Sequence, residues 1–136
     1  MDPNGAKEFV SQNHHAVMAT RRRDGSPQLS PIVVGSDAQG DLVVSSREAA
    51  VKVRNLMRDP QFDLAVFTNN FFGPWISIRG QAEVIHLPEA LPGLEQYYRS
   101  VSGEHPDWAE YRAAMAQERR VLLVLSISDV GPKVSG

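Results

Sequence analysis

The chain has no cysteine, no long apolar run and no basic amino terminus, and each absence narrows the possibilities. Without cysteine, its 136 residues can form neither disulfides nor thiolate-based sites. The longest apolar run, Val121 to Leu125, is far too short to cross a bilayer. Residues 1–5 carry neither the basic nor the apolar part of a secretory signal. We therefore expect a soluble, cytoplasmic protein that does not bind membranes.

An excess of positive charge is also missing. The 14 Lys and Arg residues stand against 16 Asp and Glu residues, which gives a formal net charge of −2. Proteins that bind nucleic acids normally have a basic balance, so we expect no nucleic-acid partner. Basic residues do gather locally, at residues 21–23 and 47–58, and such clusters fit either a small anionic ligand or a solvated surface.

The short motifs of common active sites are absent as well. The four histidines lack the spacing of metal ligands, and the sequence contains no G-x-S-x-G, G-x-G-x-x-G or P-loop string. We therefore expect no metal site, and the sequence assigns no catalytic residue.

The order of the expected elements predicts a β-barrel. The length fits a single domain of residues 1–136, with the barrel over about residues 8–128. Strands are expected at residues 15–20, 27–35, 41–45, 62–67, 75–86 and 120–127, and helices at residues 4–13, 48–58, 88–102 and 107–117. Asp24-Gly25 predicts a hairpin, and Gly80 predicts a bulge or bend in a long strand.

Short turns between strands imply antiparallel pairing. The predicted fold class is therefore mainly β (α+β), a six-stranded antiparallel barrel with flanking helices. A barrel of this size is filled by its own side chains. Any ligand must then bind on its outside, against a helix, a loop or a second subunit.

Residues 45–56 combine hydroxyls and cations at an expected strand-to-helix junction. Ser45 and Ser46 can donate to phosphate oxygens, with Ser46 also the expected helix N-cap, and Lys52 supplies a compact positive charge. The first helical turn adds free backbone N–H groups. Lys52 and Arg54 are two residues apart and do not share a helix face, so at most one reaches the same anion as the serines. The alternative is an ordinary surface helix with a good cap.

Two other segments have possible binding roles. Pro31, within residues 28–35, cannot donate to a strand ladder, which predicts an edge strand or a bulge. The free backbone groups of an edge strand can bond to a flat heterocycle, although a plain edge strand is the alternative. The aromatic loop at residues 71–75 fits an interface or a stacking platform, or else a cap on the barrel end.

A series of short strings gives the sequence a family resemblance. The strings are AVMAT at 16–20, DGSP at 24–27, SPIVV at 30–34, SS at 45–46, KVRNL at 52–56, RDP at 58–60, IRG at 78–80 and AE at 82–83. In their order and spacing, over about residues 8–128, the chain resembles the split β-barrel family that contains pyridoxamine 5′-phosphate oxidase and the F420-dependent reductases.

This resemblance implies a homodimer with two coenzyme sites in grooves between the subunits. It implies that Lys52, Ser45 and Ser46 contact the coenzyme phosphate, and that residues 30–34 border the isoalloxazine or deazaflavin ring. It also implies that Trp75 reaches the coenzyme from the second subunit. The candidate coenzyme-binding residues are Ser30, Pro31, Ile32, Val33, Val34, Ser45, Ser46, Arg47, Lys52, Arg54, Asn55 and Trp75.

The coenzyme implied by the resemblance is F420. The FMN-using oxidases carry an arginine where this chain has Ser30, and its SP and KVRNL strings resemble the F420-using branch. The sequence also lacks the carboxy-terminal extension of the true oxidases, so we do not expect pyridoxamine phosphate oxidation.

We expect an oxidoreductase that transfers a hydride from reduced F420 to a small organic acceptor, such as an electron-poor carbon–carbon double bond. The alternatives are an FMN-binding oxidase or reductase of the same fold, and a carrier that binds F420 without turnover.

Overall fold

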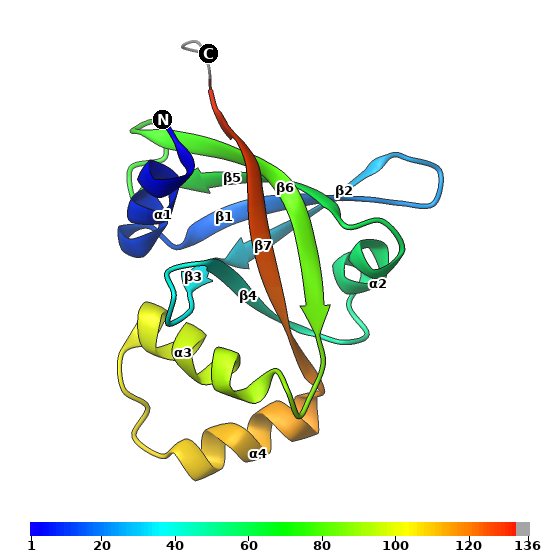
Figure 1. Ribbon diagram of the computed structural model, residues 1–136, viewed down its shortest axis with the longest axis vertical. Coiled ribbons are helices and arrows are strands. Elements are labelled where there is room, and N and C mark those ends of the chain that lie inside the picture. Colours follow the sequence, from blue (N-terminus) through cyan, green and yellow to red (C-terminus); the bar gives the residue numbers. More distant parts are fainter. Residues whose placement is uncertain (133–136) are drawn as a thin grey trace.

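In the computed structural model, which describes residues 1–132, seven antiparallel strands form a single curled sheet with four helices against it (Figure 1). The strands are β1 (His15–Arg21), β2 (Pro27–Val33), β3 (Gly35–Ser36), β4 (Leu42–Arg47), β5 (Gln61–Phe67), β6 (Trp75–Ile85) and β7 (Arg120–Gly131). The helices are α1 (Pro3–Gln12), α2 (Val51–Arg58), α3 (Leu91–Ser102) and α4 (Trp108–Glu118). None of these helices is long and apolar enough to span a membrane.

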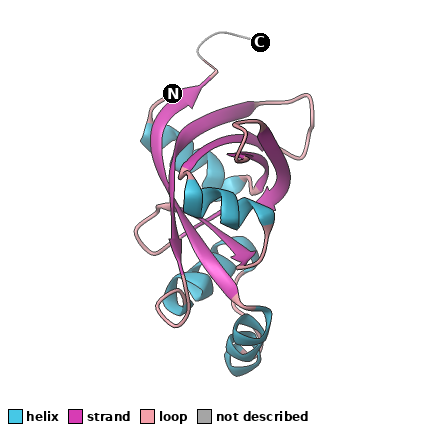
Figure 2. Ribbon diagram, turned by 90° about the vertical axis from the view of Figure 1, so that its right-hand side faces the viewer, coloured by secondary structure: helices cyan, strands magenta, loops and turns pink. Residues whose placement is uncertain are grey.

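The sheet has the strand order β2-β1-β5-β6-β7-β4-β3, so β2 and β3 lie at its opposite edges. Only Val34 separates these two strands in the chain. A seven-stranded sheet whose edges are joined by one residue must curl back on itself, and Figure 2 shows the strands curving in this way. The predicted antiparallel split barrel with flanking helices is therefore confirmed.

The predicted number of strands, six, is wrong because the expected strand at residues 27–35 is divided. Val34 is fully buried, and its backbone N–H donates to the carbonyl oxygen of His14 at 2.8 Å. After this residue the chain leaves β1 and pairs with β4 as β3. The single expected strand is thus two strands on different edges of the sheet.

Helix α3 packs directly on this crossover. A Cβ on Gly35 would lie 3.0 Å from both Tyr97 Cδ1 and Val101 Cγ2, so the close approach of α3 requires glycine there. The backbone N–H of Ser36 donates to the Ser100 hydroxyl oxygen at 3.0 Å. Helix α3 is therefore fixed at the point where the two sheet edges separate.

Side chains fill the interior of the barrel. One core cluster includes Met18, Val34, Phe62 and Leu123, and draws on strands all around the sheet. A second, smaller cluster joins α3 and α4 to the outer face of β4 and β7, in the lower part of Figure 1. Ligand binding inside the barrel is therefore excluded by packing, as the sequence predicted.

The bulge predicted at Gly80 is present, because the β6–β7 register shifts between Arg79 and Gly80. A Cβ on Gly80 would overlap the backbone carbonyl oxygen of Ser126. We predict that Gly80→Ala lowers the free energy of unfolding by about 2–3 kcal/mol, since backbone must move to admit the methyl group. Chemical denaturation measures this loss.

Gly25→Ala is the matched control for that change. Gly25 has a positive φ of 86° but nothing within 4 Å of a Cβ, so only backbone strain of about 1 kcal/mol is expected. Equal losses of the free energy of unfolding in the two variants would contradict the close approach of Gly80 to the Ser126 backbone.

Candidate functional site

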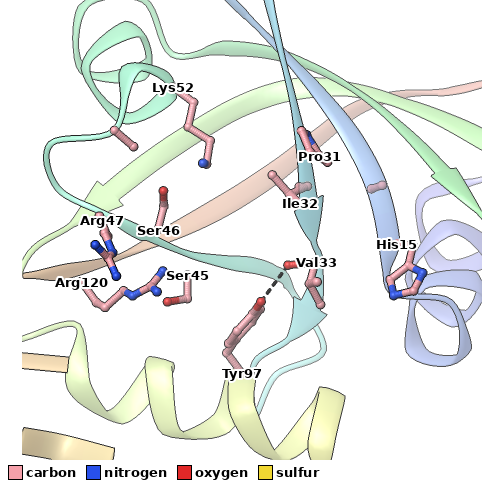
Figure 3. A pocket seen from close by; sticks show the side chains of 12 residues that line it. His15, Pro31, Ile32, Val33, Ser45, Ser46, Arg47, Lys52, Tyr97 and Arg120 are labelled. Atoms are coloured by element: carbon pink, nitrogen blue, oxygen red, sulfur yellow. Dashed lines mark hydrogen bonds between the residues drawn. The ribbon is translucent and has the colours of Figure 1, made fainter. Parts of the chain in front are cut away.

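A cavity of about 620 Å³ lies in the split between β2 and β4, beside the crossover at Val34. Its walls come from four strands (β1, β2, β4 and β7), two helices (α2 and α3) and the segment before α2, and Figure 3 shows it from close by. The lining residues are His15, Ala16, Pro31, Ile32, Val33, Ser45, Ser46, Arg47, Ala50, Lys52, Tyr97 and Arg120.

The wall formed by β2 is an edge strand, as Pro31 predicted. Backbone groups of an antiparallel strand alternate in direction, and Val34 is bonded back toward His14. The backbone groups of Val33 and Pro31 therefore point away from β1, and Pro31 occupies a position where no ladder bond is lost. The Tyr97 hydroxyl donates to the Val33 carbonyl oxygen at 2.8 Å. The Val33 N–H and the Pro31 carbonyl remain on the cavity side.

The wall formed by β4 carries the two serines on opposite faces, because side chains alternate along a strand. Ser46 is 3% exposed and lies toward Lys52, whereas Ser45 lies toward Tyr97 and Arg120 (Figure 3). Within residues 1–132 neither serine hydroxyl has a hydrogen-bond partner, and the Lys52 ammonium has neither a hydrogen bond nor an ion pair. Unpaired polar groups thus converge on the cavity from both faces of β4.

The expected helix start at residue 48, with Ser46 as its N-cap, is wrong. Strand β4 continues through Arg47, because it pairs with β7 as far as Arg120. Helix α2 begins at Val51, and its N-cap, Ala50, has no side chain able to cap it. Lys52 therefore lies in the first helical turn, at the rim of the cavity.

The cavity is positively charged. Arg47, Lys52 and Arg120 line it, and no carboxylate does. Burial, and secondly the charge of Arg120, lower the pKa of Lys52. Arg47 and Arg120 face each other in the β4–β7 register, where like charges repel. They are held together from outside the cavity by Glu118, whose Oε1 accepts from Arg120 Nη2 at 2.8 Å and from Arg47 Nη2 at 3.4 Å. One carboxylate does not balance three cations, so the cavity suits an anion.

The cavity thus brings together Pro31, Ile32, Val33, Ser45, Ser46, Arg47 and Lys52, seven of the twelve candidate residues. Ser30 lies outside it, and its hydroxyl donates to Gln28 Oε1 at 3.2 Å. Val34 points into the barrel core. Arg54 lines a separate cavity of about 480 Å³, as expected from its position two residues from Lys52.

Trp75 also lies away from this cavity in the same chain. It is 38% exposed and lines an apolar hollow of about 410 Å³ together with Phe67, Phe71 and Phe72. Phe67 and Phe71 stack at 5.5 Å, which holds part of this aromatic group together.

Five lining residues were not predicted from the sequence. The positions of His15 and Ala16 in the cavity wall result from the pairing of β1 with β2, which the Asp24-Gly25 hairpin already indicated. Ala50, Tyr97 and Arg120 had no such signal. Tyr97 and Arg120 come from α3 and β7, and only the tertiary fold brings these elements beside β2 and β4.

Comparison with known families agrees with this geometry. A family model described as pyridoxamine 5′-phosphate oxidase matches residues 3–132. The chain belongs to the pyridoxamine 5′-phosphate oxidase family. Membership supports the binding of a flavin-type cofactor, while the specific reaction varies within this fold.

Several solved structures share the fold of this family member. The conserved hypothetical protein Rv2991 from Mycobacterium tuberculosis has a TM-score of 0.78 and 20% identity, covering 100% of this chain and 92% of its own. An F420 reductase has a TM-score of 0.71 and 19% identity, covering 96% and 98%. HutZ, a heme storage protein from Vibrio cholerae, has a TM-score of 0.70 and 16% identity, covering 95% and 92%. Likenesses at these identities show the fold alone.

Asn55, the remaining candidate, is a buried structural residue. Its amide nitrogen donates to the Thr20 hydroxyl at 3.1 Å, and its oxygen accepts from Arg58 at 3.0 Å, which ties α2 to β1. We predict that Asn55→Ala lowers the free energy of unfolding by about 1–3 kcal/mol, because Thr20 loses its buried partner. The control Asn69→Ala, in an exposed loop, is expected to stay within about 0.5 kcal/mol. Similar denaturation midpoints for the two variants would contradict this role.

Proposed function

We propose that this chain is an F420-dependent oxidoreductase that holds the coenzyme in the cavity between β2 and β4. The proposal depends on one observation: two walls of the same cavity offer different kinds of binding group. The Lys52 side supplies unpaired positive charge, and the β2 side supplies a flat strand edge with backbone hydrogen-bonding groups. A molecule with an anionic group and a ring bearing amide-like donors and acceptors fits both walls.

The residues present fit the two ends of such a coenzyme. Lys52 and Ser46 would hold the phosphate group, because both lack other partners and lie toward each other (Figure 3). The Val33 N–H and the Pro31 carbonyl would hold the ring edge, as one donor and one acceptor. The apolar side chain of Ile32, from the same strand, would exclude water from the ring.

When bound in its reduced form, F420 supplies a hydride to the acceptor. The residues of this chain would bind and orient the reactants, and we assign none of them a catalytic role. FMN is the alternative coenzyme, because the same walls suit its phosphate and its ring.

Some structures of this fold belong to heme-binding proteins, and heme is also anionic. Positive charge therefore does not separate heme from a flavin. The exposed edge of β2 does favour a flavin-type ring, because the periphery of a porphyrin has no amide-like donors or acceptors to meet the Val33 N–H and the Pro31 carbonyl.

We further propose that the chain forms a homodimer in which Trp75 of one subunit reaches the coenzyme cavity of the other. Phe71, Phe72 and Trp75 form an aromatic surface at the β5–β6 turn, and Phe72 is 94% exposed. Exposed aromatic groups of this kind are typical of interfaces. A homodimer of this kind would bring the aromatic surface of one subunit over the cavity of the other.

The first test of the function is Lys52→Ala. We predict a loss of about 1.5–3 kcal/mol in coenzyme affinity, because one charge-assisted contact is removed. Fluorescence titration of the pure protein with F420 and FMN side by side measures it, and hemin serves as a third ligand. Lys7→Ala, which breaks a remote ion pair with Asp41, is the matched control.

Three outcomes of this titration count against the proposal. Tighter binding of FMN or hemin than of F420 would identify that ligand, and not F420, as the cofactor of this chain. An unchanged dissociation constant in Lys52→Ala would reject the role of that lysine. Tight F420 binding without oxidation of the reduced coenzyme by a broad panel of acceptors would favour a carrier.

The dimer is tested by sedimentation at micromolar concentration, which is expected to give twice the chain mass. We predict that Phe72→Asp shifts the protein toward monomer, because a charge cannot be buried in an apolar interface without a partner. Phe72→Leu, which keeps an apolar side chain in place, is expected to remain dimeric. A monomeric native protein, or a dimer unaffected by Phe72→Asp, would contradict the proposed interface.

A further inference from the structure

The cavity contains a second polar cluster, formed by Ser45, Tyr97 and Arg120. These side chains lie on the face of β4 toward α3, whereas Ser46 and Lys52 lie on the other side (Figure 3). Ser45 and Arg47 share this α3-facing side because they are two residues apart on the strand, and Arg120 joins them from β7 as the register partner of Arg47. The cavity therefore has two distinct places where polar groups converge.

Arg120 is the charged member of this cluster. Its side chain is only 26% exposed, so its charge is poorly screened by water. Glu118 accepts from Arg120 Nε at 3.1 Å and from Nη2 at 2.8 Å. An arginine has five N–H donors, so three of them remain, and Glu118 is shared with Arg47. The guanidinium is thus held in a fixed position with donors to spare.

The other two members supply neutral hydrogen-bonding groups. The Ser45 hydroxyl has no partner within residues 1–132. The Tyr97 hydroxyl is fixed by its bond to the Val33 carbonyl oxygen at 2.8 Å, which ties the cluster to the ring-bordering strand. Burial raises the pKa of Tyr97, although the charge of Arg120 and the backbone of Ser45 act in the opposite direction. Tyr97 is therefore a neutral phenol at physiological pH and does not offset the charge of Arg120.

We infer that the Ser45–Tyr97–Arg120 cluster is a second anion-binding subsite, which takes the carboxylate of the acceptor molecule. A guanidinium held in place and a free hydroxyl match the planar, two-oxygen shape of a carboxylate. The position fits an acceptor, because Tyr97 joins the cluster to β2, where the ring edge would lie. The identification of the ligand as the acceptor rests on the proposed function, and it makes the substrates small organic acids.

The subsite is tested with benzoate as the probe and benzamide as its neutral, isosteric control. Amide shifts of ¹⁵N-labelled protein are followed during titration, both in the free protein and in protein loaded with F420. Benzoate is expected to bind at least about tenfold more tightly than benzamide and to shift the amides around Ser45 and Arg120. Because the free protein is also titrated, the result does not depend on coenzyme binding.

Variants separate this subsite from the coenzyme anchor. Arg120→Met is expected to weaken benzoate binding at least about tenfold while F420 affinity changes less than about twofold, and Lys52→Ala is expected to show the reverse. Arg120→Lys keeps the positive charge but removes the planar set of guanidinium donors, so we expect an intermediate loss of benzoate affinity. Arg112→Met, which removes an arginine paired with Glu95 away from the cavity, is the matched control.

Three outcomes would overturn the inference. Equal binding of benzoate and benzamide, or no binding of either, would remove the anion subsite. Unchanged benzoate binding in Arg120→Met would place the carboxylate elsewhere. A loss of F420 affinity in Arg120→Met as large as in Lys52→Ala would make Arg120 part of the coenzyme anchor. Failure of F420 binding with benzoate binding intact would overturn the proposed function alone.

Discussion

The architecture depends on one short connection, the single residue between β2 and β3. Because Val34 joins the two edges of a seven-stranded sheet, the sheet must curl until those edges meet at this point. Away from Val34 the edges diverge, since β2 pairs only with β1, and β4 pairs with β3 and β7. The split that opens between β2 and β4 is the cavity. Burial of Val34, its bond to His14 and the packing of α3 on Gly35 fix the connection and so fix the mouth of the site.

Strand β4 then divides the site into two parts through the alternation of its side chains. Consecutive residues on a strand point to opposite faces, so Ser45 and Ser46 cannot serve the same small group in the way that their adjacency in sequence indicates. Ser46 joins Lys52, and Ser45 joins Tyr97 and Arg120 (Figure 3). A pair of neighbouring hydroxyls in the sequence becomes one hydroxyl for each of two polar clusters.

The sequence predicts the local features of this fold well and the long-range features poorly. The hairpin at Asp24-Gly25, the bulge at Gly80 and the edge position of Pro31 are each set by backbone chemistry of one or two residues. The crossover at Val34 has no such signal, because Ile32, Val33 and Val34 are β-branched residues that suit one continuous strand. The start of α2 depends on how far β4 pairs with β7, and the contributions of Tyr97 and Arg120 depend on where α3 and β7 pack. These are tertiary effects. The junction at residues 45–56 and the edge strand at Pro31 were predicted from their residues, and the family resemblance assigned both to one coenzyme site.

In the absence of a ligand, the unpaired positive charge in the site destabilises the folded protein. Lys52 is half-buried and has no counter-charge within residues 1–132, and its pKa is lowered in the fold, mainly by burial. A lysine with a lowered pKa destabilises the folded state wherever it is protonated, and this cost disappears only as the pH rises through that pKa toward the ordinary value. The cost is therefore fully present only at pH values well below that lowered pKa. An anion bound beside Lys52 would reverse it by favouring the protonated lysine, so binding energy and stability are coupled through the same unpaired ammonium group. A partly buried ammonium group with no counter-charge and a lowered pKa is typical of a functional site.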